Sequence, residues 1–558
     1  MVAEHTGADT ASDIGQPPAT EADAPRRGGR FTAIAPGHRW GRHDLLWRCA
    51  ATLGSGLAQL LALPPHDLWW LGPLSAALLV CAVAGTRMRR AAWLGALAGA
   101  SLMVPLVQWQ DIFGVDVWLL IAAAETVYFL PMAMGVTLVT RLPGWPLWTA
   151  ALWVGQEALR ARWPLGGFPW GKLAFAQPDT LFAGYAALGS SALVSFVVAL
   201  TGGLLLWSVL RAVHAKGRDL AWAGAGLVVS AAIMVGGTFA PKIGSPTPTE
   251  TVTVGMVQGN VPNVGEMSIL GERMQVLNNH ADGVHELAEA VRAGEQPRPD
   301  MVLLPENASD IDPFRDEAAE EIITGAAEDI GVPLLWGLSR FNDDGTRHVQ
   351  SVVWDPDTGP GEHYNKRYLV PFGEYIPYRD FFTQFVERLE QVGSDALPGT
   401  EPGAVDVDDT TLAVGICFDV AFDEPVRDAV AEGGEIIVIP TNNANYNFTG
   451  QTDQQLAITQ LRAVEHGRPA VVVSTSGVSA VVESDGSVTH RSPEAEADIH
   501  VAEVEGVDGP TVATRMGAVP ETALTGLGLA AVLVAVVSRK RSRQTNILDR
   551  EPSGPRKR

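Results

Sequence analysis

Three residues that could form a nucleophilic set lie at or near the ends of apolar stretches. Cys417 ends the run TLAVGIC, Glu306 follows MVLLP, and Lys366 lies in HYNKRYLVPFGEYIP. A thiol becomes a strong nucleophile when it loses its proton, a carboxylate can accept that proton, and an ammonium stabilises the thiolate and the oxyanion formed on an attacked carbonyl. Brought together, the three side chains would support covalent catalysis on a carbonyl group.

Each of these residues also has an ordinary structural explanation. A lone cysteine at the end of an apolar strand is often a small buried hydrophobic residue. Glu306 could be a solvated residue at a strand end, and Lys366 a surface lysine. Cys417 is the only cysteine outside the hydrophobic segments, because Cys49 and Cys81 lie in or beside them. The polar part of the chain therefore cannot form an internal disulfide or a zinc site built from cysteines.

The segments around the three candidates alternate between strand-like and helix-like patterns. Strand-like runs occur at residues 251–258, 301–305, 332–338, 349–354, 411–417, 435–440, 470–475 and 478–483. Amphipathic, helix-like stretches occur near residues 266–292, 314–329, 423–432 and 452–467. This alternation predicts a layered α/β domain, in which polar residues at strand ends meet at the edge of a sheet.

Apolar segments flank this domain on both sides. They lie at residues 49–66, 68–86, 91–110, 117–140, 142–156, 180–210, 220–241 and 522–538. Most are long enough to cross a bilayer as helices, which requires roughly 20 apolar residues. We therefore predict about eight membrane-spanning helices. Glu125 and Glu157 lie within or beside these segments, where a charge is costly and often has a function.

Clusters of basic residues orient the apolar segments. One cluster precedes the first segment, one separates the second and third, one separates the sixth and seventh, and one follows the eighth. Alternating crossings place all four clusters on the same side, which the positive-inside rule identifies as the cytoplasm. The acidic domain then lies on the extracytoplasmic side of the cell membrane, tethered at both of its ends.

These patterns divide the chain into five parts. We predict a disordered cytoplasmic tail at 1–43, seven transmembrane helices in 44–241, an extracytoplasmic catalytic domain at 242–519, a last transmembrane helix at 520–538 and a basic cytoplasmic tail at 539–558. The chain has 558 residues and a formal net charge of -23, and most of its acidic residues lie in the catalytic domain. That acidity excludes nucleic acid as a partner, because phosphate binding needs clustered Lys and Arg.

The segments around the three candidates resemble the nitrilase superfamily. The match lies in LLPEN around Glu306, YNKRYLVPFGEYIP around Lys366 and GICFD around Cys417, in that chain order. The resemblance implies an α-β-β-α sandwich with Cys417 as nucleophile, Glu306 as general base and Lys366 as the oxyanion-stabilising cation. It further implies that Glu374 is a second carboxylate that helps to hold the lysine.

The arrangement of the whole chain resembles a narrower family, the apolipoprotein N-acyltransferases. A nitrilase-like domain lies between the seventh and eighth apolar segments, and the loops GGFPWGK (166–172) and VQGNVP (257–262) also match. The likeness covers about residues 45–540. It implies that an acyl chain moves from a phospholipid to the N-terminal amine of a diacylglyceryl-modified apolipoprotein. The reaction would be ping-pong, through a thioester on Cys417, with no metal and no cofactor.

Five further positions bear on how closely this chain follows the family. Asp419 stands where the family usually has Glu, and we expect it to support the catalytic residues. Phe418 stands where an aromatic residue is expected, and we expect it to contact substrate. Met267 lies near a position where some members carry Trp. Trp170 would line the lipid entrance or serve as an interfacial anchor. Asn442 opens a loop, NNANYNFTG, that is a looser version of a family loop near the active site, and we expect it to contact substrate.

Other functions remain open from the sequence. A membrane-anchored nitrilase-type amidase would act on a small amide or nitrile, with water as second substrate. A non-catalytic scaffold of the same fold would be favoured by a missing triad residue, whereas all three are present. A transporter is disfavoured, because the apolar segments do not form paired, interrupted helices in two related halves.

Overall fold

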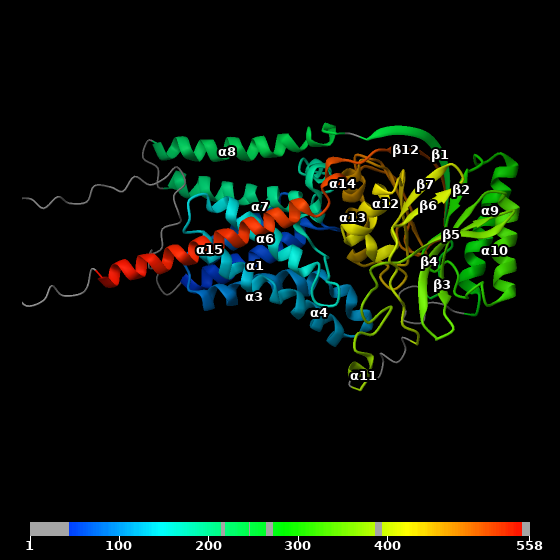
Figure 1. Ribbon diagram of the computed structural model, residues 1–558, viewed down its shortest axis with the longest axis horizontal. Coiled ribbons are helices and arrows are strands. Elements are labelled where there is room, and N and C mark those ends of the chain that lie inside the picture. The colour runs from blue at the N-terminus through cyan, green and yellow to red at the C-terminus, as the bar shows by residue number, and fades with distance from the viewer. Residues whose placement is uncertain (1–43, 214–217, 245, 264–271, 385–392, 549–558) are drawn as a thin grey trace, which may run out of the picture.

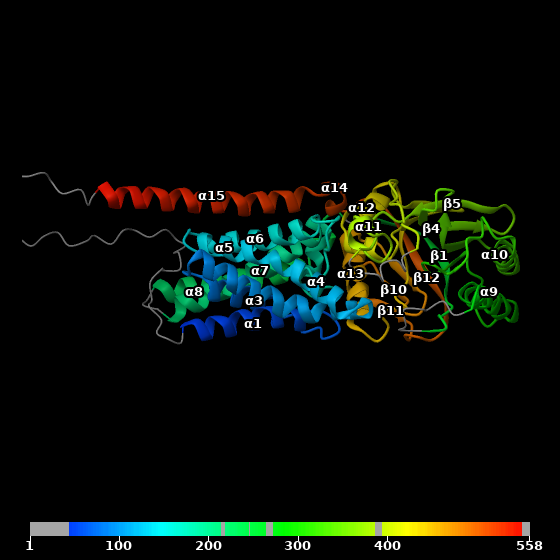
Figure 2. The same ribbon diagram turned by 90° about the horizontal axis from the view of Figure 1, so that it is seen from below.

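The chain folds into a helical bundle joined end to end with a β-sandwich (Figures 1 and 2). The computed structural model describes residues 44–213, 218–244, 246–263, 272–384 and 393–548. The tail predicted at 1–43, the last residues of the basic tail (549–558) and Met267 lie outside the described residues.

The helical bundle contains the first helices of the chain and the last one. Its helices are α1 (Asp44–Ala62), α2 (Leu71–Val83), α3 (Met88–Leu106), α4 (Val115–Val127), α5 (Phe129–Val139), α6 (Trp145–Arg160), α7 (Ala186–Val213), α8 (Arg218–Gly237) and α15 (Val519–Leu548). Helix α15 packs against α5, α6 and α7, so the end of the chain completes the bundle. The beginning of α1 and the end of α15 lie at the end of the bundle farthest from the sandwich (Figure 1).

Four helical segments among the described residues are long and apolar enough to cross a membrane. They are Val115–Val139, Ala183–Val213, Arg218–Gly237 and Val519–Arg539, which correspond to four of the eight predicted crossings. The other four predicted crossings correspond to α1, α2, α3 and α6. Helix α2 is apolar but has only 13 residues, and α6 has 16. Eight crossings therefore stay a prediction.

The sandwich consists of two six-stranded sheets. The first has the order β12-β1-β2-β3-β4-β5, and the second has the order β11-β10-β9-β8-β7-β6. The strands of the first are β1 (Thr247–Gln258), β2 (Met301–Leu303), β3 (Leu334–Phe341), β4 (Arg347–Asp355), β5 (Gly359–Asn365) and β12 (Asp498–Asp508). Those of the second are β6 (Ala404–Val407), β7 (Thr410–Val414), β8 (Ile436–Thr441), β9 (Ala470–Ser474), β10 (Ala480–Val482) and β11 (Val488–Arg491).

Each sheet has a parallel centre. Strands β1, β2 and β3 run parallel in the first sheet, and β7, β8 and β9 run parallel in the second. The carboxyl ends of parallel strands are where α/β folds collect polar side chains. Each sheet therefore presents one such edge to the site.

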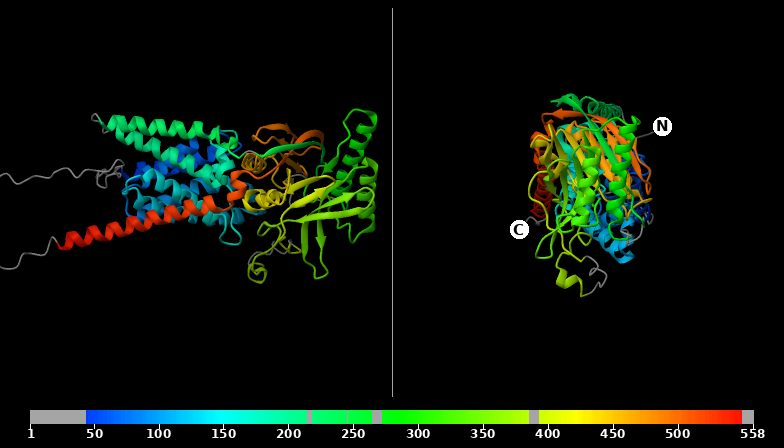
Figure 3. Two further views of the ribbon diagram at one scale, coloured as in Figure 1. Left: turned by 45° about the horizontal axis from the view of Figure 1, so that its top comes forward. Right: turned by 90° about the vertical axis from the view of Figure 1, so that its right-hand side faces the viewer.

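Helices cover the outer face of each sheet and give an α-β-β-α sandwich. Helices α9 (Gln275–Ala293) and α10 (Glu317–Ile330) pack on the first sheet. Helices α12 (Glu424–Ala431) and α13 (Gly450–His466) pack on the second, and α11 (Arg379–Phe382) and α14 (Val512–Met516) are short. Figure 3 shows α9 and α10 at the far end and the second helix layer beside the bundle.

The alternation of side chains along a strand explains these layers. In β8, Ile436 and Val438 face the core between the sheets, whereas Ile437 and Ile439 face the helices. A strand that is apolar on both faces must be covered on both sides. The predicted layered α/β fold is thus confirmed.

Helix α13 lies between the second sheet and the helical bundle and is buried along most of its length. One hydrophobic core continues from the bundle through α12 and α13 to the second sheet. Polar residues of α13 bind loops of the bundle: Gln454 accepts a hydrogen bond from Trp170 Nε1 at 2.7 Å, and Gln460 donates one to Asp179 at 3.0 Å. Burial of these side chains is tolerated because they are paired.

A buried ionic network joins the two parts of the protein. Asp423 lies just before α12, with Arg462 of α13 2.7 Å from one carboxylate oxygen and Lys172 of the bundle 3.4 Å from the other. Ser191 of α7 donates a further hydrogen bond to Asp423 at 3.2 Å. Burial alone would raise the pKa of Asp423, but the charges of Lys172 and Arg462 outweigh burial and hold that pKa well below its ordinary value.

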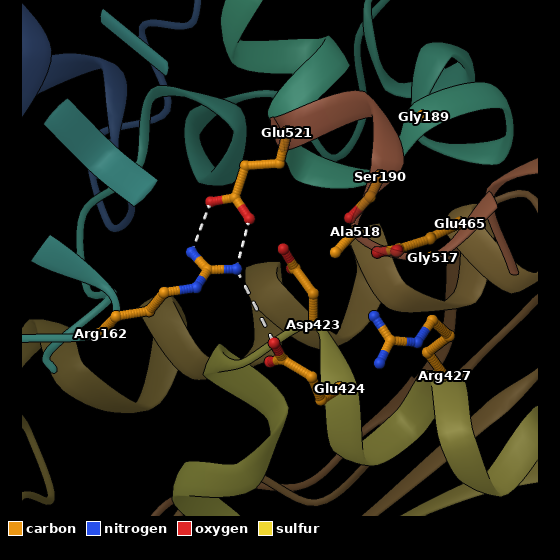
Figure 4. Close-up of a pocket in the computed structure, with 10 residues that line it drawn as sticks. All are labelled: Arg162, Gly189, Ser190, Asp423, Glu424, Arg427, Glu465, Gly517, Ala518 and Glu521. Atoms are coloured by element: carbon orange, nitrogen blue, oxygen red, sulfur yellow. Dashed lines mark hydrogen bonds and ion pairs between the residues drawn. The ribbon is translucent and has the colours of Figure 1, made fainter. Parts of the chain in front are cut away.

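A second ion pair lies beside this network and is drawn in Figure 4. Arg162, after α6, binds both carboxylate oxygens of Glu521 in α15, at 2.9 and 2.6 Å, and lies 3.8 Å from Glu424 of α12. Helix α7 departs from helical geometry here, at Gly189 and Ser190. Four helices from distant parts of the sequence therefore meet at one polar junction.

We expect Asp423→Asn to destabilise the protein by roughly 3–5 kcal/mol, because it leaves two buried cations without their shared carboxylate. Asp428→Asn is the matched control: its pairs with Arg367 and Arg427 are partly exposed, and surface pairs are worth about 0–1 kcal/mol. Denaturant unfolding of the purified full chain in detergent measures both.

The sign of the pH dependence follows from the lowered pKa of Asp423. Its stabilising contribution is complete above the ordinary carboxyl pKa and is lost as the pH falls through the lower, folded value. The difference between wild type and Asp423→Asn should therefore persist at neutral pH. Equal stability of Asp423→Asn and Asp428→Asn at that pH would contradict this account of the junction.

Candidate active site

Glu306, Lys366 and Cys417 converge at the edge where the two sheets meet. Glu306 follows β2, Lys366 follows β5, and Cys417 begins the 3-10 helix η6 (Cys417–Ala421) after β7. Lys366 Nζ lies 2.8 Å from Glu306 Oε1, and a hydrogen bond joins the Glu306 carboxyl group to the thiol of Cys417. The exposed fractions are only 3%, 1% and 9%, respectively. The site thus combines strand ends from both sheets in a water-poor environment.

The backbone around Glu306 fixes the direction of its carboxyl group. Glu306 Oε2 accepts a hydrogen bond from the backbone N–H of Asn442, at the end of β8, at 3.0 Å. The chain passes so close to β3 that a Cβ at Gly337 would lie 2.0 Å from the carbonyl oxygen of Pro305. A glycine is therefore required at 337 for Glu306 to reach the lysine.

A second carboxylate binds Lys366. Glu374 Oε1 lies 2.8 Å from Lys366 Nζ, and Glu374 Oε2 accepts a hydrogen bond from the backbone N–H of Val370 at 2.7 Å. The ammonium group thus lies between two carboxylates, which compensates the cost of burying a charge.

Asp419 ties the lysine segment to the cysteine turn. Its carboxylate accepts hydrogen bonds from the Tyr364 hydroxyl at 2.9 Å and from the backbone N–H groups of Tyr368 at 2.7 Å and Ile416 at 3.1 Å. Burial raises the pKa of Asp419 to about 6. Cys417 itself has a φ of 49°, in the left-handed region that residues other than glycine rarely adopt. The contacts of Asp419 hold this unfavourable turn in place.

The protonation states of the three residues follow from burial and mutual charge. Burial, and then the charge of Glu306, raise the pKa of Cys417 to about 12, so the resting group is a thiol at neutral pH. Burial also raises the pKa of Glu306, against the opposing charge of Lys366. Burial lowers the pKa of Lys366, but the carboxylates outweigh it and the net shift is well upward. The arrangement can therefore pass a proton from sulfur to carboxylate beside a permanent cation.

An aromatic cluster lies between Cys417 and the helical bundle. The ring of Phe418 lies 6.3 Å from that of Trp170, which lies 5.6 Å from Trp109. The ring of Tyr446 lies 5.0 Å from Trp109 and so connects the cluster to the loop after β8. Trp170 is only 2% exposed. Two residues predicted to contact substrate, Trp170 and Phe418, are thus neighbours beside the nucleophile candidate.

Asn442 contributes mainly through its backbone. Its N–H donates to Glu306, as described above, whereas its side-chain oxygen accepts a hydrogen bond from the Thr475 hydroxyl at 3.0 Å. Tyr446, in the same loop, was not singled out from the sequence. Burial, and then the charge of Cys417, raise the pKa of its phenol. The sequence pointed to the asparagine-rich loop as a whole, but no pattern within the loop distinguished Tyr446.

The buried carboxylates of the bundle support the loop that carries Trp170. Glu125 lies 3.4 Å from Arg160, whose guanidinium donates to the carbonyl oxygen of Trp170. Glu157 accepts hydrogen bonds from Trp153 Nε1 at 3.1 Å and from the backbone N–H of Leu173 at 2.8 Å. Both acidic residues thus have structural partners within the bundle.

A cavity of about 290 Å³ opens at the junction beside the aromatic cluster. It is lined by Ala161, Arg162, Gly166, Lys172, Tyr368, Phe422, Asp423, Glu424 and Glu521. The ring of Phe422 lies 5.1 Å from that of Phe418.

Among the described residues, no group of three or more His, Cys, Asp and Glu side chains could hold a metal ion.

Comparison with known proteins identifies the family. Residues 55–204 match the model of the apolipoprotein N-acyltransferase N-terminal domain, and residues 253–508 match the carbon-nitrogen hydrolase model. A nitrilase-superfamily amidase from Nesterenkonia AN1 overlaps with a TM-score of 0.35 at 19% identity, covering 47% of this chain and 93% of its own. That overlap is too weak to bear on function.

Two relatives match nearly the whole chain. The apolipoprotein N-acyltransferase of Mycolicibacterium smegmatis is 35% identical over 523 residues, which is 90% of this chain and 87% of that protein. The apolipoprotein N-acyltransferase of Chromobacterium violaceum is 28% identical over 527 residues, 90% of this chain and 95% of that protein. The chain is therefore an acyltransferase and belongs to the apolipoprotein N-acyltransferase family.

Proposed function

We propose that the protein transfers an acyl chain from a phospholipid to the N-terminal α-amine of a diacylglyceryl-modified apolipoprotein, through a thioester on Cys417. The observation that carries the proposal is the convergence of Glu306, Lys366 and Cys417 in one buried site. Only if all three side chains meet can a neutral thiol be deprotonated and an oxyanion be stabilised in the same step.

In the first half-reaction, Cys417 Sγ attacks the ester carbonyl of the phospholipid. The thiol proton passes to Glu306 as the carbon–sulfur bond forms, and Lys366 stabilises the negative charge on the carbonyl oxygen. The tetrahedral intermediate then collapses, the ester carbon–oxygen bond breaks, and Glu306 returns the proton to the departing lysophospholipid. The acyl chain remains on sulfur as a thioester.

In the second half-reaction, the apolipoprotein amine attacks the thioester. An α-amine has a pKa of about 7.7–8.0, so a useful fraction is neutral at physiological pH. Glu306 accepts a proton from the attacking amine, the carbon–sulfur bond breaks, and the proton returns to Cys417. The scheme is ping-pong and uses no metal and no cofactor.

The supporting residues have roles in this scheme that follow from their contacts. Glu374 holds Lys366, and Asp419 holds the turn of Cys417. We assign Trp170 and Phe418 to contacts with the acyl chain, because their rings adjoin the nucleophile on the bundle side. Asn442 orients Glu306 through its backbone N–H.

The position of the site supports lipid substrates. The aromatic cluster and the junction cavity lie where the sandwich meets the bundle, so a lipid in the adjacent leaflet would have a short path to Cys417. We propose that the bundle spans the cell membrane with about eight helices formed by 44–241 and 520–538. The end of α7, the beginning of α8 and the end of α15 lie away from the sandwich (Figure 1), and Arg211, Arg218 and Arg539 lie there. This favours an extracytoplasmic sandwich.

Cys417→Ala should abolish formation of the acyl-enzyme, because it removes the sulfur. After incubation with phospholipid labelled in its acyl chain, the wild type should carry a hydroxylamine-sensitive label and the variant none. Cys81→Ala is the matched control, since Cys81 lies in α2, and it should label like the wild type. Labelling of Cys417→Ala at the wild-type level would refute the thioester. Release of ammonia from small amides by the wild type would instead favour an amidase.

Glu306→Gln should slow acylation by roughly 10²–10⁴-fold, the usual contribution of a general base. In the wild type, acylation needs ionised Glu306, whose pKa is raised. The rate should therefore fall as the pH drops through a value above the ordinary carboxyl range of about 4.3. Glu286→Gln, an exposed change on α9, should leave the rate and its pH profile unchanged. A Glu306→Gln enzyme with the wild-type profile would remove Glu306 from the mechanism.

A further inference from the structure

Thr441 lies beside Cys417 at the carboxyl end of the neighbouring strand. The parallel register of β7 and β8 pairs Leu412 with Ile436 and Val414 with Val438. Strand β8, which ends at Thr441, contacts the 3-10 helix η6, which begins at Cys417. Thr441 is completely buried, and a hydrogen bond joins its hydroxyl to the cysteine sulfur.

Two glutamines of α13 fix the direction of this hydroxyl group. Gln451 Nε2 donates to Gln455 Oε1 at 3.0 Å, and Gln455 Nε2 donates to Thr441 Oγ1. Because the oxygen of Gln455 is occupied by Gln451, its amino group faces Thr441. A hydroxyl group has one proton and accepts through its lone pairs. The Thr441 oxygen therefore accepts from Gln455, and its proton is free to point at sulfur.

Because the charged groups around Cys417 are mostly negative, a neutral hydrogen-bond donor can help to stabilise a thiolate there. Lys366 is the cation of the site, but it is bound to Glu306 and Glu374, which carry two negative charges between them. Asp419 of η6 adds a further carboxylate, and burial, followed by the charge of Cys417, raises the pKa of the Tyr446 phenol in the loop after β8. The charged surroundings thus oppose a thiolate on balance, whereas α13 contributes neutral glutamines.

We propose that Thr441 donates its hydroxyl proton to the sulfur of Cys417 and stabilises the thiolate character that develops during acylation, held in this direction by the Gln451–Gln455 pair. Hydrogen bonds to a charged group are stronger than those between neutral groups. The inference rests on the proposed role of Cys417 as nucleophile.

Thr441→Val and Thr441→Ser test the proposal, because the first removes the hydroxyl at nearly constant volume and the second keeps it. The rate of thioester formation on the full chain in detergent would be measured against pH with acyl-labelled phospholipid. Thr441→Val should slow acylation roughly ten- to a hundredfold at neutral pH, as expected for a lost hydrogen bond to a charged group. Its pH profile should move upward, while the phospholipid concentration for half-maximal rate stays the same. Thr441→Ser should have the wild-type rate and the wild-type pH profile.

Thr459→Val is the matched control. Thr459 is also completely buried on α13, but its hydroxyl donates to the backbone carbonyl of Gln455 at 3.1 Å. The Thr459→Val variant should leave the pH profile of acylation unchanged. A Thr441→Val enzyme that matches Thr459→Val in rate and pH profile would overturn the proposal. Formation of the thioester by the wild type, and its absence in Cys417→Ala, test separately whether Cys417 is the nucleophile.

Gln455→Glu tests the direction of the hydrogen bonds without altering Thr441. A carboxylate at 455 can only accept, so it would draw the Thr441 proton away from sulfur. It should therefore reproduce the slower rate and the upward pH shift of Thr441→Val, even if Thr441→Val itself folds poorly. Wild-type acylation by Gln455→Glu would show that the hydroxyl does not serve Cys417.

Discussion

The buried contact between Lys366 and Glu306 is the interaction on which the site depends. An ammonium with 1% exposure is tolerated only because Glu306 and Glu374 both lie 2.8 Å away. The same pairing leaves the site with an excess of negative charge, and burial, followed by the charge of Glu306, raises the pKa of Cys417 and keeps its thiol protonated at rest. In the proposed mechanism, the reactivity of Cys417 therefore comes from proton transfer during attack and from neutral donors such as Thr441. In that mechanism, the charges that stabilise the buried lysine also determine how the sulfur is activated.

This geometry requires both sheets and the bundle at once. Glu306 and Lys366 come from the first sheet, Cys417 comes from the second, and Asp419 connects them through Tyr364, Tyr368 and Ile416. Arg462 of α13 donates to the carbonyl oxygen of Val420 at 2.9 Å, within the turn that begins at Cys417, and also binds Asp423. Because Asp423 binds Lys172 of the bundle, the position of Cys417, the proposed nucleophile, is coupled to the helical bundle.

Much of the fold, and the residues that would converge at the candidate site, could be predicted, because both follow local patterns. The alternation of strand-like and helix-like runs predicted the layers, and the polar residues at strand ends singled out Glu306, Lys366 and Cys417. The burial of the polar face of α13 could not be predicted, since its partners, Trp170 and Asp179, lie almost 300 positions earlier. Glu125 and Thr441 were unassigned for the same reason: their partners are set by packing, not by spacing. The membrane crossings were predicted from apolar length, which α2 and α6 satisfy poorly.

The ion pair between Arg162 and Glu521 has a consequence for biogenesis. Glu521 lies in the first turn of the last helix, whereas Arg162 and Glu424, its neighbours, are synthesised much earlier. Synthesis proceeds from the N-terminus, so the sandwich is complete before α15 leaves the ribosome. Until α15 is in place, the guanidinium group of Arg162 at this junction is only partly neutralised. The last helix therefore completes the junction, and a chain shortened before Glu521 would lack this ion pair and would depend on the Asp423 network and the shared hydrophobic core to join the bundle to the sandwich.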